Sequence, residues 1–498
     1  MQEDKHTQTS DQAKASPKNT GKLGKKRVGQ SALCLSVGLV LGILGTNTYT
    51  TGRLPWDLLA SDQALSAADL RKLQYGYQIL NDQYIGDVKK GEVVNGAMAG
   101  MADSVKDPYT AYLTGAASES LDETIKGSFE GIGAQVTTEN GWLTIISPIK
   151  DSPAEKAGLQ ANDIILEVDG KSTKGLSTEE AVKMIRGEKG TEVELKIKRG
   201  DQEQTVKVKR DEIPIETVHA RLMDQAPDVG HIQISEFSET TYDELVQNLK
   251  DLQKQGAKKF VLDVRGNPGG LLPSVLKVAN IFLEEGQTIL KVEDNQGEEQ
   301  VYQANSQDLG DFKVQAPLVV LIDEGSASAS EILAGALQQS GQVPVVGQNS
   351  YGKGSVQTVF PLDKNGKMKV TVAKWLTPDG TWINEKGIQP DIEQSLPEYA
   401  KLTLIDTSQH YKAGQQSEAV LNIQKILHSL GYLSEDQVTS RYDQGTVEAV
   451  QTVQEEAGLK VTGEVDGETA LRLTQKMQEK IKANDSQLDK AIDVLAQA

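Results

Sequence analysis

The sequence predicts a multidomain α/β protein that ends in a small helical bundle. Its 498 residues exceed the usual size of one domain and suggest three or four. An apolar run at 317–323, typical of a buried strand, passes through a short turn into the helical periodicity of 329–337, as expected of an α/β core. Beyond residue 397 the strand patterns stop, and two similar helical units follow.

The chain begins with a basic segment followed by a short apolar one. Residues 1–30 carry seven Lys or Arg against three Asp or Glu, although the whole chain has a formal net charge of −19. The acidic remainder argues against nucleic acid as a partner, and basic residues before an apolar segment mark the cytoplasmic side of a membrane. We therefore predict a cytoplasmic tail at 1–30 and a single-pass transmembrane anchor at 31–50.

The apolar segment leaves an alternative open. Its centre, Ala32 to Gly45, is short for a membrane span and also fits the apolar part of a cleaved signal peptide. No convincing cleavage site follows, so the anchor is the preferred interpretation. A cleaved signal would place the same domains outside the cell without a tether. The single cysteine, Cys34, lies in this segment, so the exported part has no intramolecular disulfide.

Residues 66–126 are predicted to form an N-terminal helical segment. Apolar residues recur at helical spacing from Leu70 to Met101, and Asp107-Pro108 closes the run. No side chain in this segment suggests chemistry. We expect it to pack against the rest of the protein.

Residues 127–211 alternate strand patterns with one helix, predicted at 178–185. The loop before the first long strand contains Gly131, Ile132 and Gly133. Successive N–H groups in such a loop can hold a peptide carboxylate, while a plain strand bulge is the alternative. Arg186 follows the helix and is a candidate for a charged contact with a bound peptide tail or with the core, or else a solvated cation at a helix end.

The core is predicted at 212–400. Strands are expected at 229–234 and 259–264, with a helix at 242–255 between them and a glycine-rich loop after the second strand. In the turn after 317–323, Ser328 and Glu331 fit a capping box at the start of the next helix. Backbone N–H groups and the helix dipole converge there, so Ser328 is either a nucleophile or an ordinary helix cap.

A second loop carries Lys353 between two glycines. None of the five histidines lies near a glycine-rich elbow, and His231, inside a predicted strand, is expected to be structural. A Ser-His-Asp triad is therefore poorly supported, whereas a Ser-Lys dyad is a recognised variant. Burial lowers the pKa of a lysine from about 10.4 toward roughly 7 to 8, where the amine can accept the proton of a serine.

Two similar helical units fill residues 413–475. The recurring pairs are Val420 and Gln424 with Val450 and Gln454, and Asp443 and Thr446 with Asp466 and Thr469. The repetition predicts a small helical bundle. It contains no metal-ligand or nucleophile pattern, and we predict no metal or cofactor for the protein.

Several motifs, in order, resemble those of the carboxyl-terminal processing serine peptidases. Among them are L-D-V-R-G-N-P-G-G at 262–270, S-A-S-A-S-E-I at 326–332, Y-G-K-G-S-V-Q at 351–357 and W-L-T-P-D-G at 375–380. The resemblance implies Ser328 as nucleophile, Lys353 as base and Gln357 as the group that orients the lysine. It also implies a crotonase-like α/β peptidase core. The implied oxyanion donors are the N–H of Gly269 or Gly270 and that of Ala329.

Two further resemblances extend the prediction. The motif D-S-P-A-E-K-A-G-L at 151–159 is similar to one in PDZ domains of bacterial proteases, so 127–211 is identified as an inserted PDZ domain. The repeats at 413–475 resemble a peptidoglycan-binding domain, with a helical protein–protein module as the alternative. In the peptidase family, a helical segment such as 66–126 packs beside the core and can mediate dimer contacts.

Together these resemblances imply a membrane-anchored serine endopeptidase whose catalytic domains lie on the wall side of a bacterial cell membrane. The expected partners are proteins with exposed C-termini, the membrane, peptidoglycan and a second copy of the chain. The alternative is a peptide- and wall-binding scaffold with an inactive peptidase-like core. Retention of Ser328, Lys353 and Gln357 favours the enzyme.

Overall fold

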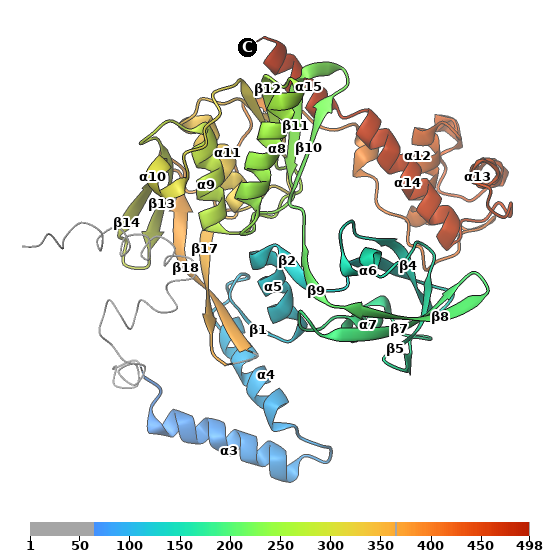
Figure 1. Cartoon of the computed structure of the whole chain (residues 1–498), viewed down its shortest axis with the longest axis horizontal. Helices are drawn as coiled ribbons and strands as arrows, with labels where there is room; N and C mark the ends of the chain where they lie inside the picture. The colour runs from blue at the N-terminus through green and yellow to red at the C-terminus, as the bar shows by residue number, and fades with distance from the viewer. Residues whose placement is uncertain (1–63, 364–365, 498) are drawn as a thin grey trace, which may run out of the picture. The chain divides into compact units, whose positions relative to one another are not determined.

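The computed structural model describes residues 64–363 and 366–497 (Figure 1). The predicted tail at 1–30 and anchor at 31–50 lie outside the described residues. Within the described ranges, no helix is both long enough and apolar enough to cross a membrane.

The N-terminal segment contains a strand as well as helices. Its elements are α3 (Ala67–Gln83), α4 (Lys90–Asp103), β1 (Ala111–Thr114) and α5 (Ala116–Lys126). The sequence pattern predicts only helices there, yet β1 pairs antiparallel with a core strand, Ala111 opposite Lys369. Helix α3 buries none of its residues, contrary to the packing role expected of it.

The insert at 127–211 has its own sheet and its own apolar core. Its strands are β3 (Ala134–Glu139), β4 (Trp142–Pro148), β5 (Ile164–Val168), β6 (Lys171–Ser172), β7 (Glu192–Arg199) and β8 (Gln202–Lys209). Helices α6 (Pro153–Lys156) and α7 (Thr178–Ile185) complete it, and α7 has the predicted bounds. Strands β2 (Ser128–Gly131) and β9 (Asp211–Pro214) pair antiparallel, so the chain enters and leaves the insert side by side.

A six-stranded sheet forms the centre of the core. Its order is β10 (Val218–Met223), β11 (Ala226–Ile234), β12 (Lys259–Asp263), β15 (Leu318–Ile322), β16 (Val345–Gly347) and β19 (Ile392–Glu393). β10 is antiparallel to β11, and every later pair is parallel. The carboxyl ends of the parallel strands therefore meet at one edge, where the loops after β12 and β15 lie together.

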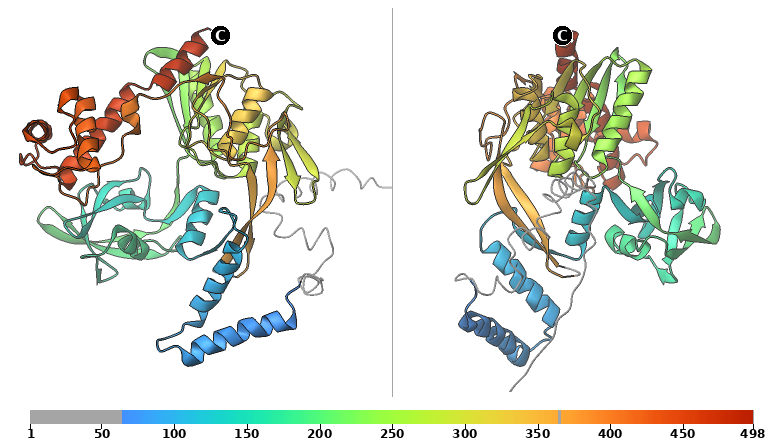
Figure 2. Two further views of the ribbon diagram at one scale, coloured as in Figure 1. Left: turned by 180° about the vertical axis from the view of Figure 1, so that it is seen from behind. Right: turned by 60° about the vertical axis from the view of Figure 1, so that its left-hand side comes forward.

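The two faces of this sheet are covered by different parts of the chain (Figures 1 and 2). Helices α8 (Thr241–Gln255), α9 (Leu272–Phe282) and α11 (Ala329–Gln339) share a core with one face, which includes Leu262 and Val320. The residues that alternate with these, such as Val261 and Val319, pack against α15 (Ser486–Ala496).

A second sheet joins β1 of the N-terminal segment to strands of the core. Strands β1, β18 (Gly366–Leu376), β13 (Thr288–Asp294) and β14 (Glu299–Gln303) follow one another in it, and β17 (Ser355–Pro361) pairs with β18. The short helix α10 (Ser306–Leu309) follows β14. Lys353 lies just before β17, so the β17–β18 hairpin positions its loop.

The tail contains a helical bundle, as predicted. Its elements are η3 (Glu398–Lys401), α12 (Glu418–Leu430), η4 (Glu435–Gln437), α13 (Gln444–Ala457) and α14 (Gly467–Ala483). The repeated glutamines, Gln424 and Gln454, are fully buried, and each amide oxygen accepts two backbone N–H groups of the loop after its helix. Helix α14 runs past the predicted end of the module at 475, and α15 packs on the core sheet instead of in the bundle.

Candidate active site

Ser328 lies in the turn between β15 and α11 with a strained backbone. Its φ of 53° and ψ of −110° cost an L-residue about 1–3 kcal/mol. Neighbouring contacts maintain the strain, because Ala327 N donates to Asn267 O at 3.0 Å and Ser328 N donates to Glu331 Oε2 at 2.7 Å. The predicted capping box is present. The Ser328 hydroxyl, however, donates to no other group in the described part of the chain, and a strained serine with an undonated proton suits a nucleophile.

Glu331 connects the serine turn to the lysine loop. It is completely buried, and its carboxylate accepts hydrogen bonds from Ser328 N at 2.7 Å, Ser350 Oγ at 2.6 Å, Gly352 N at 2.6 Å and Lys353 N at 2.9 Å. A buried carboxylate needs such partners, so these four donors hold the two loops together. Sequence reasoning missed this role, because Ser350 lies 19 residues away and no local pattern links it to Glu331.

Lys353 has the environment of a base. Its ammonium Nζ lies 4.9 Å from the centroid of the Tyr109 ring. Burial lowers the pKa of Lys353 below its ordinary value and the charge of Lys369 lowers it further, while the carboxylates of Glu331 and Asp107 act in the opposite direction. A lysine with a lowered pKa is neutral, and able to take a proton, closer to neutral pH.

The three predicted catalytic side chains are not joined by hydrogen bonds. Among the described residues, neither Ser328 Oγ nor Gln357 bonds to Lys353 Nζ. The Gln357 amide donates instead to Ser355 Oγ at 2.9 Å and to Thr371 Oγ1 at 3.3 Å. The Lys353 side chain must therefore turn from the Tyr109 ring toward Ser328 before it can take the serine proton.

The glycine loop after β12 lies against the serine turn. A Cβ on Gly269 would stand 2.9 Å from Ser328 Cβ and 3.0 Å from Ala329 N, so no larger residue fits without a shift. The Gly269 N–H donates to Asn267 Oδ1 at 2.8 Å. Those of Gly270 and Ala329 donate to no described residue. Of the three predicted oxyanion donors, Gly270 and Ala329 thus have N–H groups available, and Gly269 shapes the loop.

In the insert, the loop of Gly131, Ile132 and Gly133 is held in place. Ile132 is buried, and the Gly133 carbonyl accepts hydrogen bonds from Ser152 Oγ and Ile149 N, each at 2.9 Å. The N–H groups of Ile132 and Gly133 donate to no group within the described ranges. They remain available to a peptide carboxylate.

Arg186 links the insert to a helix outside it. From the end of α7 it forms an ion pair with Glu123 of α5, and its guanidinium lies 5.1 Å from the centroid of the Phe129 ring. The side chain of Arg186 is still 40% exposed, so it can also meet a ligand. The sequence suggests a charged contact for this residue but not its partner.

Four known family patterns match the chain. "Peptidase family S41" matches residues 228–394, "PDZ domain" 144–199, "Putative peptidoglycan binding domain" 416–473 and "Activating protease CtpB N-terminal domain" 55–116. The first of these ranges contains Ser328, Lys353 and Gln357.

Individual proteins match over most of the chain. The "Carboxy-terminal processing protease CtpA" of Bacillus subtilis (strain 168) is 42% identical over 466 residues, which cover 93% of this chain and 95% of that protein. The "Probable CtpA-like serine protease" of Staphylococcus aureus (strain MSSA476) is 39% identical over 428 residues, covering 86% and 85%. Among solved structures, a "photosystem II D1 C-terminal processing protease" is 30% identical and covers 65% of this chain and 86% of that one, with a TM-score of 0.37.

Proposed function

Because this chain belongs to the carboxy-terminal processing serine proteases of peptidase family S41, we propose that it cleaves peptide bonds with a dyad of Ser328 and Lys353. The observation that carries the proposal is the buried carboxylate of Glu331, which binds the backbones of both residues. The strained Ser328 and the partly buried Lys353 lie on two loops that this carboxylate joins. Such an arrangement suits a catalytic pair.

The dyad works by ordinary nucleophilic catalysis. Lys353, once neutral and turned toward Ser328, takes the hydroxyl proton while the serine oxygen bonds to the substrate carbonyl carbon. The N–H groups of Gly270 and Ala329 are the donors for the oxyanion that forms. Lys353 then gives its proton to the leaving amine. A water molecule, deprotonated by the same lysine, hydrolyses the acyl-enzyme and frees Ser328.

The alternative of an inactive scaffold is set aside. The relatives that match nearly the whole chain are carboxy-terminal processing proteases. The strained backbone of Ser328 and the lowered pKa of Lys353 also reduce the stability of the fold, and an inactive scaffold would gain nothing from either.

Substrate recognition through the C-terminus is the proposed role of the insert. The chain matches the PDZ domain family, and the loop of Gly131 to Gly133 has undonated N–H groups that suit a terminal carboxylate. Arg186 lies beside this loop, since a Cβ on Gly131 would stand 3.9 Å from its Cγ. A bound tail that drew Arg186 away from Glu123 would favour one arrangement of insert and core over another.

We propose that the protein is anchored by residues 31–50 in a bacterial cell membrane and binds peptidoglycan through its tail bundle. The basic residues before that segment support the orientation, and the match to a peptidoglycan-binding family supports the second contact. A second copy of the chain is a further proposed partner, because α3 leaves Leu70, Leu73, Ile79 and Leu80 exposed.

Cleavage of an unstructured protein such as casein tests the dyad. Ser328→Ala and Lys353→Ala should each abolish cleavage with the fold intact, and the double variant should lose little more, because members of one catalytic unit are not additive. Gln357→Ala should keep partial activity. Lys386→Ala, at an exposed lysine in a neighbouring loop, is the control. Full activity of Lys353→Ala at neutral pH would exclude the dyad.

A further inference from the structure

Helix α15 returns from the tail bundle to the core sheet, where it docks firmly. Asn484 alone separates α14 from Asp485, which caps α15 by accepting from Leu488 N at 3.0 Å. The apolar face of α15 packs on the sheet through Leu488, Ala491 and Leu495. At its far end Lys259 Nζ donates to Leu495 O at 2.6 Å.

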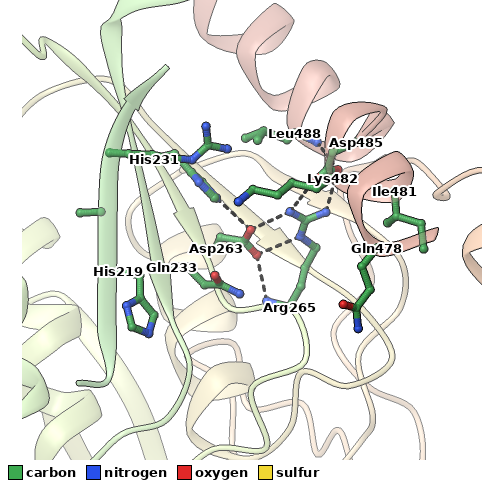
Figure 3. Close-up of a pocket in the computed structure, with 12 residues that line it drawn as sticks. His219, His231, Gln233, Asp263, Arg265, Gln478, Ile481, Lys482, Asp485 and Leu488 are labelled. Carbon is green, nitrogen blue, oxygen red and sulfur yellow. Dashed lines mark hydrogen bonds and ion pairs between the residues drawn. The ribbon is translucent and has the colours of Figure 1, made fainter. Parts of the chain in front are cut away.

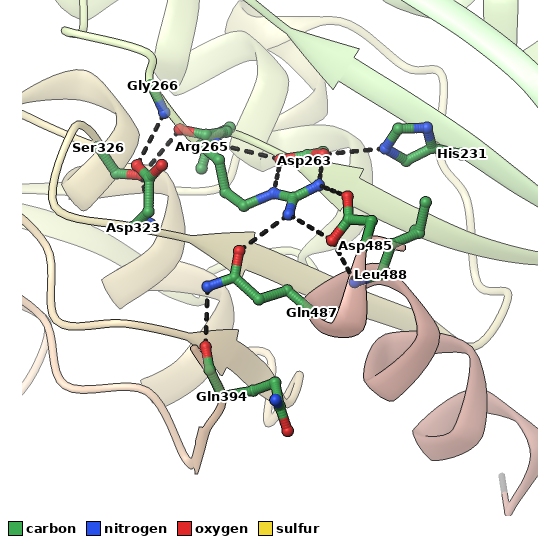
Figure 4. Close-up of polar contacts among 11 residues, drawn as sticks. His231, Asp263, Arg265, Gly266, Asp323, Ser326, Gln394, Asp485, Gln487 and Leu488 are labelled. Atoms are coloured by element: carbon green, nitrogen blue, oxygen red, sulfur yellow. Dashed lines mark hydrogen bonds and ion pairs between the residues drawn. The ribbon is translucent and has the colours of Figure 1, made fainter. Parts of the chain in front are cut away.

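The start of α15 meets the core at Arg265 (Figure 4). Arg265 Nε and Nη2 donate to Asp263 at 2.9 and 2.7 Å, and Nη1 and Nη2 donate to Asp485 at 2.9 and 2.7 Å. Nη1 also donates to Gln487 Oε1 at 2.9 Å. All five guanidinium donors are thus used, three of them by the tail. The side chains of Arg265 and Asp485 are only 13% and 18% exposed.

The surroundings of Asp263 favour its charged form. Burial alone would raise the pKa of Asp263, but the hydrogen bonds and charges of Arg265 and His231 hold it well below its usual range. His231 Nε2 lies 2.9 Å from Asp263 Oδ2, so this histidine has a buried hydrogen-bond partner, as expected of a structural residue. A cavity of about 500 Å³ borders the cluster toward β10 and β11, and Asp263, Arg265 and Asp485 are among the residues that line it (Figure 3).

Arg265 begins the loop that carries Gly270, one of the two proposed oxyanion donors. After it, Gly266 N donates to Asp323 Oδ1 at 2.8 Å, and Asn267 Oδ1 holds Gly269 N at 2.8 Å. The Asn267 carbonyl accepts from Ala327 N at 3.0 Å and from Ser330 Oγ at 2.9 Å. Hydrogen bonds therefore connect α15 to Arg265, and the backbone connects Arg265 to Asn267 two residues later. Asn267 in turn accepts hydrogen bonds from Ala327 and Ser330, which lie on either side of Ser328.

We propose that Asp485 and Gln487 are positioning residues for catalysis: by fixing Arg265, they hold the loop 266–270 against the Ser328 turn. The proposal rests on the proposed dyad, since an oxyanion loop matters only if the serine forms a tetrahedral intermediate. Without the tail, three guanidinium donors lose their partners, and Asp263 is the one side chain that still fixes Arg265 among the described residues. The backbone N–H groups that stabilise the oxyanion are then less precisely placed. Because the oxyanion develops in the transition state and not in the bound substrate, kcat should fall more than KM rises.

Asp485→Asn tests this in the full-length enzyme, because asparagine keeps the helix cap and the size while removing the charge. We expect kcat to fall about tenfold with KM within about twofold, as for an interaction used in the transition state. Adding Gln487→Glu to Asp485→Asn returns a carboxylate to Arg265 Nη1 and should restore most of kcat. Asp489→Asn is the matched control: it lies one turn later on α15 and contacts Gln225 instead of Arg265.

A substrate-like peptide aldehyde reports on the oxyanion loop directly. The Ser328 oxygen bonds to the aldehyde carbon, the carbonyl π pair becomes the oxyanion, and the serine proton passes to Lys353. Asp485→Asn should weaken aldehyde binding by the same factor as kcat/KM and leave the affinity of the product peptide unchanged.

The possible outcomes separate this proposal from the dyad. An aldehyde adduct that requires Ser328 but is indifferent to Asp485 would overturn the positioning role alone. So would equal losses of kcat in Asp485→Asn and Asp489→Asn. Aldehyde binding that is the same in wild type and Ser328→Ala would overturn the dyad and this proposal together.

Discussion

At the scale of single residues, the surroundings of Lys353 lower its pKa, as its proposed role as a base requires. Burial is the main cause of its lowered pKa, and Lys369 is the next. Lys369 lies on β18 opposite Ala111 and forms no ion pair in the part of the chain that the structure describes. Its positive charge is therefore not neutralised by a carboxylate of its own.

Lys369→Met should shift the pH dependence of cleavage. Removing the positive charge raises the pKa of Lys353, so a larger fraction of the lysine is protonated at a given pH and the acid limb of kcat/KM moves to higher pH. At high pH the variant and the wild type should converge. The measurement is kcat/KM across neutral and alkaline pH.

Lys374→Met is the control for this shift. Lys374 lies on the same strand, but its charge is paired with Glu293 at 2.7 Å. It should leave the acid limb in place. An acid limb that stays unchanged in Lys369→Met would show that the charge of Lys369 does not lower the pKa of Lys353.

Glu331→Gln should damage both activity and stability. The amide has one acceptor oxygen in place of two, and its NH₂ group would face the donors of Ser350 and Gly352. Buried donors left without acceptors cost about 1–3 kcal/mol, and kcat should fall by about 100-fold as the two loops separate. Thermal unfolding and casein cleavage measure the two effects. Glu324→Gln, at an exposed position of the same turn, should change neither.

At the scale of elements, the insert is connected to the rest of the chain by more than its two chain crossings. Arg186 of α7 pairs with Glu123 of α5, which lies outside the insert. Gly133, a natural position at which to block the peptide loop, is a poor probe: its φ is +73°, and a Cβ there would stand 2.5 Å from Ser152 Cβ. A substitution would disturb the start of α6 as well as the ligand loop.

Arg186→Gln is the better test of substrate recognition. If Arg186 contacts the carboxylate of a bound tail, the variant should lower kcat/KM about tenfold for proteins with free apolar C-termini, the usual size of a lost charged contact. Amidating the substrate tail should do the same in wild type and add little in the variant.

Glu123→Gln distinguishes this role from a structural link. It breaks the same ion pair but leaves the charge of Arg186 for the ligand, so cleavage should be equal to wild type or faster. If Arg186→Gln and tail amidation both leave kcat/KM unchanged, the insert is a passive spacer.

At the scale of the whole molecule, the tail contacts the core through α15 in addition to carrying the bundle for which we propose peptidoglycan binding. The face of the sheet opposite α8, α9 and α11 is apolar, and α15 is the helix that covers it. The covered side chains are Met223, Val229, Val261, Val319, Leu321 and Val346. A tail used only for attachment would not need this contact.

Removing the whole tail and replacing only its bundle should therefore have different effects on activity. A chain that ends after Lys412 loses α15 and should be destabilised and inactive, since each buried leucine contributes roughly 1.5–3 kcal/mol. A chain in which a long Gly/Ser linker replaces 413–482 keeps α15 and should still cleave casein. It should lose pull-down by purified peptidoglycan. Wall binding that survives this replacement would refute the role of the bundle, and normal activity without α15 would refute its role in the core.

The sequence by itself determined the local features of this protein. Helix α7 has its predicted bounds, α8 begins one residue before the prediction, and the repeats at Gln424 and Gln454 form the expected bundle. Such features depend on periodicity, caps and turns within about ten residues, so they can be recognised without a fold. Motif resemblance proposed Ser328 and Lys353 as the catalytic pair in the same way, because each lies in a short distinctive loop.

Only the tertiary structure decided which distant groups meet. The four donors on Glu331 come from two loops, the pKa of Lys353 depends on Lys369 of another strand, and Arg265 binds Asp485 across 220 residues of chain. The sequence predicted neither β1 in the second sheet nor α15 on the far face of the core sheet. It also assigned Gln357 to the lysine, although the Gln357 amide donates to Ser355 and Thr371. The reason is physical: hydrogen bonds and charges act over a few ångströms in space, and packing of whole elements sets which residues come that close.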